Sequence, residues 1–307
     1  MSLKQLIMST VLVCNMVLAF TDENECNPQP NPDNISYIGP GHQGMFASIN
    51  SVLHDLLWCE KNNKIPVVFW DDRSNYYKPG GFNGSDNVWE YYFQPVAHVN
   101  PRPKDVVPRP SWERIGRFWD QDIIDQEARN NAQRLIDKYI RFNPIVQIKI
   151  DAFYQTYMEG KKTVGIHLRG TDKEIEVKLV SPEEIVAIAL EAADKDAQFL
   201  IASDEKGRFE EMKELLKKHN RTVIFYDCYR AESKKPLHLD SSRDRCVLGE
   251  DVLIEAKLLS QCDLFVHTMS CVSTGVLYFN ASLKHIRVGE TWQIKNGRIY
   301  FTRPLRR

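Results

Sequence analysis

The second half of the chain alternates regularly between short apolar runs and longer amphipathic runs. From Thr163 the apolar runs are TVGIHL, QFLIAS, TVIFYD and DLFVH, and helical patterns lie between them. The first of these helices is expected to begin after Ser181 as its N-cap, with Pro182 in the first turn. Strands that alternate with helices of this length predict a parallel sheet covered on both faces.

The first half contains a shorter unit of the same kind. The apolar run ISYI leads into a glycine-rich turn from Gly39 to Gly44, then into a helical pattern and a second apolar run, IPVVFW. After a proline-rich stretch at 99–110, a helical pattern extends to about Met158. Two α/β units in one chain predict two facing Rossmann-like domains with a cleft between them, residues 22–160 and residues 161–307.

The N-terminus carries the pattern of a secretory signal peptide. Lys4 precedes a mostly apolar stretch from Leu6 to Phe20, so we expect residues 1–21 to be removed; a retained signal anchor is the alternative. No other stretch approaches the ~20 apolar residues of a membrane-spanning helix, and no stable membrane span is expected. The expected location is the secretory pathway, the periplasm or the extracellular space, or the Golgi or ER lumen in a eukaryote.

The cysteines suit an oxidising compartment. Cys14 would leave with the signal peptide, and six of the seven cysteines would remain. Cys228 and Cys246 bracket one polar loop and are the pair that we first expect to form a disulfide. Buried free thiols are the alternative.

The charge balance argues against a polyanionic partner. Lys and Arg number 40 and Asp and Glu number 41, which gives a formal net charge of -1. Such a chain has no overall field to attract it to nucleic acid or to an anionic membrane. The expected partners are small or neutral molecules.

Polar side chains follow three of the predicted strands at the point where each strand ends. In an open parallel sheet, ligands bind at the carboxyl edge, where such side chains meet. Loop polarity and helix capping would explain any one of these groups, but their coincidence less well. The sequence therefore predicts a binding site formed by His167, Arg169, Asp172, Ser203, Asp204, Glu205, Thr268 and Ser270.

Three segments of this half resemble, in order, three motifs of one enzyme superfamily. GIHLRGTDK, LIASDE and LIEAKLLSQCDLFVHTMS are similar to consecutive motifs of the GDP-fucosyltransferases, which include core α1,6-fucosyltransferases, nodulation fucosyltransferases and protein O-fucosyltransferases. The match covers Thr163 to Ser270 and is looser from Gly39 to Phe93. The resemblance implies a GT-B-like, metal-independent, inverting glycosyltransferase that binds GDP-fucose in its C-terminal domain.

The resemblance also implies roles for individual residues. Arg169 would contact the donor pyrophosphate, Glu255 would contact guanine, and Ser270 would supply a hydroxyl group after the last strand. Without a divalent cation the protein must neutralise the departing GDP, and a permanently charged arginine fork can do so. The acidic residue of the second motif would be Asp204, next to Glu205. Further candidate donor contacts are His42, His167 and Lys173.

The catalytic base is open between three carboxylates. An inverting transfer needs a base for the attacking hydroxyl group, and the position of the family's carboxylate counts to Val177 here. We rank Glu176 first, then Asp172, then Glu174. Many members also carry a second arginine where Gly170 stands, so the phosphate contacts would be fewer or Lys173 would compensate.

Three further features have a structural interpretation and a functional one. The core is expected to contain Trp70, Trp89, Tyr91, Tyr92 and Phe93, with an acceptor-sugar platform as the alternative. Asp120 with Asp122, and Asp194 with Asp196, have the form of a metal-binding motif but lie in helical patterns, so no metal is expected. His42 is either a contact across the cleft or a solvated loop histidine.

The function predicted from the sequence is transfer of fucose from GDP-fucose to a glycan or protein acceptor. A second hypothesis keeps the glycosyltransferase and changes the donor to another nucleotide sugar. A third is a non-catalytic carbohydrate-binding relative, because Gly170 and the displaced carboxylate depart from the family pattern.

Overall fold

The computed structural model of the protein describes residues 34–41, 43–97, 125–171, 179–232, 240, 242–289, 291–295 and 298–302. The expected signal peptide and the proline-rich stretch at 99–110 lie outside these residues. No helix among the residues described is long and apolar enough to cross a membrane.

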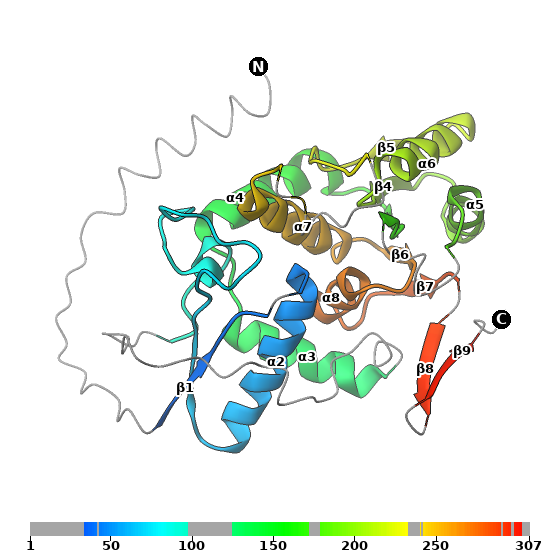
Figure 1. Cartoon of the computed structure of the whole chain (residues 1–307). Helices are drawn as coiled ribbons and strands as arrows, with labels where there is room; N and C mark the ends of the chain where they lie inside the picture. Colours follow the sequence, from blue (N-terminus) through cyan, green and yellow to red (C-terminus); the bar gives the residue numbers. More distant parts are fainter. Residues whose placement is uncertain are drawn as a thin grey trace.

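A five-stranded parallel sheet forms the centre of the second half (Figure 1). Its strands are ordered β5-β4-β3-β6-β7. The central strand is β3, which comes first in the sequence among these five. All four pairings are parallel, which confirms the predicted α/β class with a parallel sheet. The strands are β3 (Thr163–His167), β4 (Gln198–Ala202), β5 (Val223–Ile224), β6 (Leu264–His267) and β7 (His285–Arg287).

Helices cover both faces of this sheet. The helices α5 (Pro182–Ala192) and α6 (Lys206–Lys218) pack on one face in a cluster with alternate strand residues such as Ile166 and Ile201. The helices α7 (Arg245–Leu259) and α8 (Cys271–Phe279) pack on the other face. Helix α5 begins as predicted, because the Ser181 hydroxyl group accepts a hydrogen bond from the Glu184 amide.

The first half forms the predicted strand–helix–strand unit. Strands β1 (Ile35–Ile38) and β2 (Ile65–Val68) pair in parallel, and α2 (Met45–Lys61) connects them. The later helical pattern is interrupted, because Asn143 and Pro144 begin a new helix. The other elements are η2 (Val88–Tyr91), α3 (Gln126–Tyr139), α4 (Pro144–Phe153), the π-helical turn η5 (Tyr154–Met158), and the hairpin of β8 (Thr291–Lys295) and β9 (Arg298–Thr302).

The two halves share one hydrophobic cluster. Residues of β1, α2, α3 and α4 pack with α7 and α8 in a continuous core. Glycines permit the closest approaches: a Cβ atom at residue 249 would lie 2.8 Å from the Met45 side chain, and a Cβ atom at residue 275 would overlap the Phe46 ring. The aromatic residues Trp70, Trp89, Tyr91, Tyr92 and Phe93 are fully buried here, which confirms the core interpretation.

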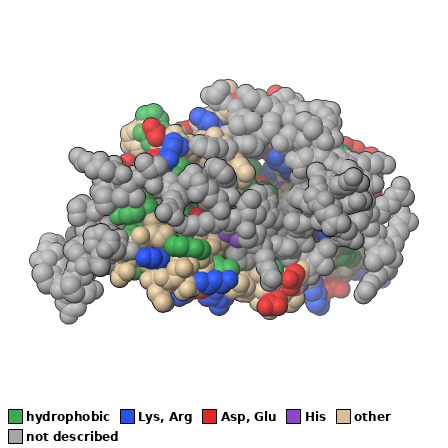
Figure 2. Space-filling model, turned by 60° about the horizontal axis from the view of Figure 1, so that its bottom comes forward, with side chains coloured by type: hydrophobic (Ala, Val, Ile, Leu, Met, Phe, Trp, Pro, Cys, Tyr) green, Lys and Arg blue, Asp and Glu red, His purple; other side chains and the backbone are tan. Residues whose placement is uncertain are grey.

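The surface carries charges of both signs. On the face in Figure 2, Lys and Arg side chains lie among Asp and Glu side chains and neutral groups, with no large area of one charge among the coloured atoms. This distribution agrees with the near-neutral net charge of the sequence.

The expected disulfide between Cys228 and Cys246 is wrong, because both residues are free thiols in the structure. The Cys246 thiol group instead donates to Asp244 Oδ1 at 2.9 Å in the first turn of α7. Cys228 lies beside Glu255, and burial raises the pKa of its thiol group well above the ordinary value. The neighbour of the Cys246 sulfur is therefore Asp244, and that of the Cys228 sulfur is Glu255.

We predict that Gly275→Ala destabilises the fold by about 1–3 kcal/mol, because the added methyl group would overlap the Phe46 ring in a packed core. Urea unfolding measures the change. Gly207→Ala is the control, because a Cβ atom at residue 207 meets nothing within 4 Å. Equal stability of the Gly275→Ala variant and the wild-type protein would contradict this packing.

Candidate active site

The carboxyl ends of β3, β4 and β6 bring Arg169, Asp204 and Thr268 into contact. The Arg169 guanidinium group forms an ion pair with the Asp204 carboxylate. The Arg169 backbone amide donates to the Thr268 hydroxyl group at 3.0 Å. Three strand ends that the sequence placed at one edge of the sheet are thus linked by direct hydrogen bonds.

Two neighbouring carboxylates hold the loop that follows β3. Asp204 accepts hydrogen bonds from the Gly170 amide at 2.8 Å and from the Thr171 hydroxyl group at 2.6 Å. Glu205 accepts a hydrogen bond from the Thr171 amide at 3.3 Å and pairs with Arg208 Nε at 3.3 Å. Both side chains were predicted to contact the donor, and in the structure both bind the Arg169 loop.

The first turn of α8 lies beside the end of β3. The Ser270 hydroxyl group caps the helix by accepting a hydrogen bond from the Ser273 amide at 3.0 Å, and the Ser273 hydroxyl group lies 3.1 Å from His167 Nδ1. Burial lowers the pKa of His167 to about 4, so this histidine is neutral at neutral pH. No acidic residue stands in the first turn, and the positive end of the α8 dipole has no carboxylate of its own to neutralise it.

The first turn of α2 approaches the same region. Its N-cap Gly44 offers no side-chain hydrogen bond, and the Met45 amide donates to the Tyr76 hydroxyl group at 2.7 Å. Burial raises the pKa of Tyr76, while the Met45 hydrogen bond and the nearby Arg169 charge act in the opposite direction. Tyr76 is a site residue that sequence reasoning missed, because it stands in a polar loop without periodicity.

Helices α2 and α8 pack together (Figure 1), and the first turn of α2 lies against the middle and the end of α8. The rings of Phe46 and Phe279 lie edge to face with centroids 6.0 Å apart. The N-terminus of α2 lies near Arg169 through Tyr76, and the N-terminus of α8 follows Thr268, which accepts the Arg169 amide hydrogen. Such an arrangement favours an anion, because the free N–H groups and the helix dipoles point toward it.

Glu255, the predicted guanine contact, lies on α7 and pairs with Arg230. The distance from Arg230 Nη2 to Glu255 Oε1 is 2.8 Å, and the other Arg230 nitrogen donates to the Ser203 carbonyl group at 2.5 Å. Arg230 was not recognised in the sequence, because it lies in an irregular loop after β5. It links Glu255 to the end of β4 and places that carboxylate on the same edge of the sheet.

Glu255 belongs to a group of three carboxylates on α7. Glu250 pairs with Lys149, and Asn83 donates to its other oxygen at 2.8 Å. Burial, together with the charges of Glu255 and Glu250, raises the pKa of Asp251 to about 7. Through Lys149 and Asn83, Glu250 connects this part of α7 to the first half of the chain.

Five predicted residues lie outside the described residues. They are His42, Asp172, Lys173, Glu174 and Glu176. Their roles stay predictions. Among the residues that the structure describes, no group of three or more His, Cys, Asp or Glu side chains is arranged to hold a metal ion. Asp194 forms an exposed ion pair with Lys162 at 2.5 Å.

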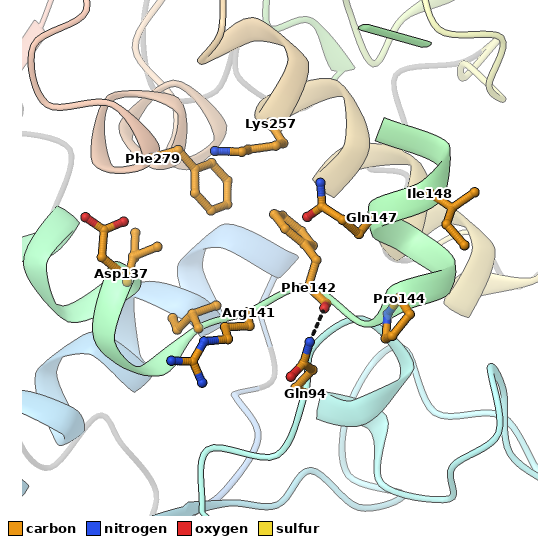
Figure 3. A pocket seen from close by; sticks show the side chains of 11 residues that line it. Gln94, Asp137, Arg141, Phe142, Pro144, Gln147, Ile148, Lys257 and Phe279 are labelled. Carbon is orange, nitrogen blue, oxygen red and sulfur yellow. Dashed lines mark hydrogen bonds between the residues drawn. The ribbon is translucent and has the colours of Figure 1, made fainter. Parts of the chain in front are cut away.

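A cavity of about 520 Å³ lies away from the strand ends (Figure 3). Lys257 and Phe279 lie on one side of it, and Gln94 and Arg141 on the other. Lys257 is in the last turn of α7 and Phe279 is the last residue of α8, whereas the predicted Ser270 caps the opposite end of α8. The cavity contains none of the predicted residues, so we assign the candidate site by its converging polar groups.

No protein-family model matches the sequence, and no curated protein matches it. Solved structures share its fold. Fucosyltransferase NodZ from Bradyrhizobium matches with a TM-score of 0.54 and 15% identity over 88% of this chain and 99% of that chain. NodZ α-1,6-fucosyltransferase soaked with GDP-fucose gives a TM-score of 0.53 at 15% identity, with the same coverage.

POFUT1 in complex with GDP-fucose matches with a TM-score of 0.50 and 11% identity, over 84% of this chain and 98% of that chain. At these identities the likeness concerns the fold. It confirms the resemblance to the GDP-fucosyltransferases at that level, because each of these matches spans most of both chains.

We predict that Asp251→Asn changes the pH dependence of stability. The carboxyl pKa is about 7 in the folded protein against 3.8 unfolded, so between these values the folded protein retains a proton that the unfolded chain has lost. Wild-type stability therefore falls as pH rises through this window, whereas Asn has no proton to lose. Relative to wild type, the variant should gain up to ~1.4 kcal/mol per pH unit, measured by urea unfolding from pH 4 to pH 8. Parallel pH profiles would contradict the assignment.

Proposed function

We propose that the protein is a glycosyltransferase that transfers fucose from GDP-fucose to a glycan or protein acceptor. The observation that carries this proposal is the position of Arg169, at the carboxyl edge of a parallel sheet and close to the first turns of α2 and α8. The fold supports it, because the similar NodZ and POFUT1 structures are described with GDP-fucose.

Arg169 would stabilise the departing GDP. Cleavage of the bond between sugar and phosphate places negative charge on the diphosphate, and a guanidinium group can bind two of its oxygens at once. The backbone N–H groups at the start of α8 would add donors to the same anion. These N–H groups are fixed before the reaction begins, whereas Arg169 must exchange Asp204 for the diphosphate. In this scheme the transfer needs no metal and inverts the anomeric configuration.

The proposed architecture is GT-B-like, with residues 22–160 on the acceptor side and residues 161–307 on the donor side. The strand–helix–strand unit of the first half supports this division, as does the approach of α2 to the edge of the larger sheet. The proposed signal peptide would direct the protein to a secretory, periplasmic or extracellular location, where glycan and glycoprotein acceptors are available.

Transfer requires a base next to the acceptor hydroxyl group. We propose Glu176 first, then Asp172 and Glu174, because all three follow directly on the loop that carries Arg169.

A different nucleotide-sugar donor is the second candidate. The observation that favours it is the ion pair between Arg230 and Glu255, which engages the carboxylate proposed to contact guanine. GDP-fucose and other nucleotide sugars, tested side by side for nucleotide release, separate the two candidates. Tight GDP binding without turnover of any donor would support a non-catalytic relative instead.

We predict that Arg169→Ala lowers turnover of GDP-fucose by about a hundred- to a thousand-fold while the protein stays folded. GDP release and calorimetric GDP binding measure the effect, and circular dichroism tests the fold. Arg141→Ala is the control, because Arg141 is exposed and lines the separate cavity. Normal turnover of the Arg169→Ala variant, or loss of wild-type activity on addition of EDTA, would contradict the mechanism.

We predict that Glu176→Gln removes the acidic limb from the pH dependence of kcat. A carboxylate base must be unprotonated, so wild-type kcat should fall as pH drops below the pKa of the base. The same profile is measured for Asp172→Asn and Glu174→Gln. The variant that loses the limb, with kcat lowered by about 10²–10⁴-fold, identifies the base. An acidic limb that survives in all three variants would refute a carboxylate base in this segment.

A further inference from the structure

Thr171 has an unusual backbone conformation next to Arg169. Its φ is 40°, in the left-handed region, and its side chain is buried. The other non-glycine residues with positive φ among the described residues are Asn63, Asn83 and Asn220, and asparagine tolerates this region well. A β-branched residue does not, and such a conformation persists only where the surroundings hold it.

The surroundings that hold Thr171 are the two carboxylates after β4. Glu205 accepts the Thr171 amide hydrogen, and Asp204 Oδ2 accepts the hydroxyl hydrogen at 2.6 Å. The same clamp requires glycine at position 170, where a Cβ atom would lie 2.8 Å from Glu205 Cβ and 3.0 Å from Arg208 Cδ. Many fucosyltransferases carry a second arginine at this position. Here the close packing of the loop against Glu205 leaves room only for glycine.

The Thr171 hydroxyl group and the Arg169 guanidinium group donate to the same oxygen, Asp204 Oδ2. The other oxygen of Asp204 accepts the Gly170 amide. A carboxylate with these two additional donors remains hydrogen-bonded if the guanidinium group turns away. Without them, separation of the ion pair would leave a nearly buried charge unpaired, which opposes the separation strongly.

We propose that Thr171 is a positioning residue that weakens the hold of Asp204 on Arg169, so that Arg169 can transfer to the diphosphate of a nucleotide donor. This inference rests on the proposed function. Loss of the hydroxyl group leaves Arg169 more firmly bound to Asp204, and the diphosphate must then compete with a stronger ion pair. Donor affinity falls as a result, whereas the chemistry of the bound donor changes less.

Three substitutions separate the hydroxyl group from the backbone. Thr171→Val removes the hydroxyl group and keeps the branched shape, Thr171→Ser keeps the hydroxyl group, and Thr171→Gly removes the hydroxyl group and relieves the backbone conformation. Calorimetric titration of the full-length protein with GDP gives Kd, donor kinetics give KM and kcat, and thermal unfolding gives the folded fraction.

We expect the Val and Gly variants to raise Kd for GDP and KM for GDP-fucose about tenfold or more, with a smaller change in kcat, and the Ser variant to stay within about threefold of wild type. Wild-type affinity in both Val and Gly variants would overturn the inference. Weak binding by the Thr171→Val variant with normal binding by the Thr171→Gly variant would also overturn it, because the backbone conformation would then be responsible. Absence of GDP binding by the wild-type protein would instead refute the proposed function.

Discussion

The central position of β3 in the sheet is the constraint on which the candidate site depends. Parallel pairing with β4 on one side and β6 on the other places His167 beside Ala202 and His267 in register. The residues that follow the three strands must then meet at one edge. The ion pair of Arg169 with Asp204, and the hydrogen bond from the Arg169 amide to Thr268, are consequences of that register.

The electrostatic character of this edge follows from what surrounds Arg169. The neighbouring imidazole of His167 is neutral, because burial lowers its pKa to about 4. The first turns of α2 and α8 contain no acidic side chain, so their dipoles are not neutralised locally. The negative charge of Asp204 is directed into the loop after β3, where it holds backbone and side-chain donors. An anion that approaches this edge therefore meets donors on more than one side.

The packing of the two halves fixes where α2 lies relative to that edge. Gly249 and Gly275 allow α7 and α8 to approach Met45 and Phe46 closely. Through this contact the Tyr76 hydroxyl group, which accepts the first amide of α2, is held within electrostatic range of Arg169. A change in the shared core would shift one wall of the site against the other, since interiors are packed too densely to absorb such movement.

The sequence by itself determined the elements and their order. Local periodicity specifies the strands from TVGIHL to DLFVH, and the Ser181-Pro182 pair specifies where α5 begins. Because parallel strands share one edge, it also located Arg169, Asp204 and Thr268 near one another. These predictions succeeded because each depends on residues a few positions apart, or on a rule that holds for all parallel sheets.

Only the tertiary structure decided which side chains are partners. The pairing of Arg230 with Glu255, the contact of Tyr76 with α2, and the position of Cys228 beside Glu255 join positions far apart in the chain. The Asp204 carboxylate likewise binds the Gly170 amide, a contact between residues 34 positions apart. Such contacts arise from the packing of distant elements, and no local pattern of residues records them.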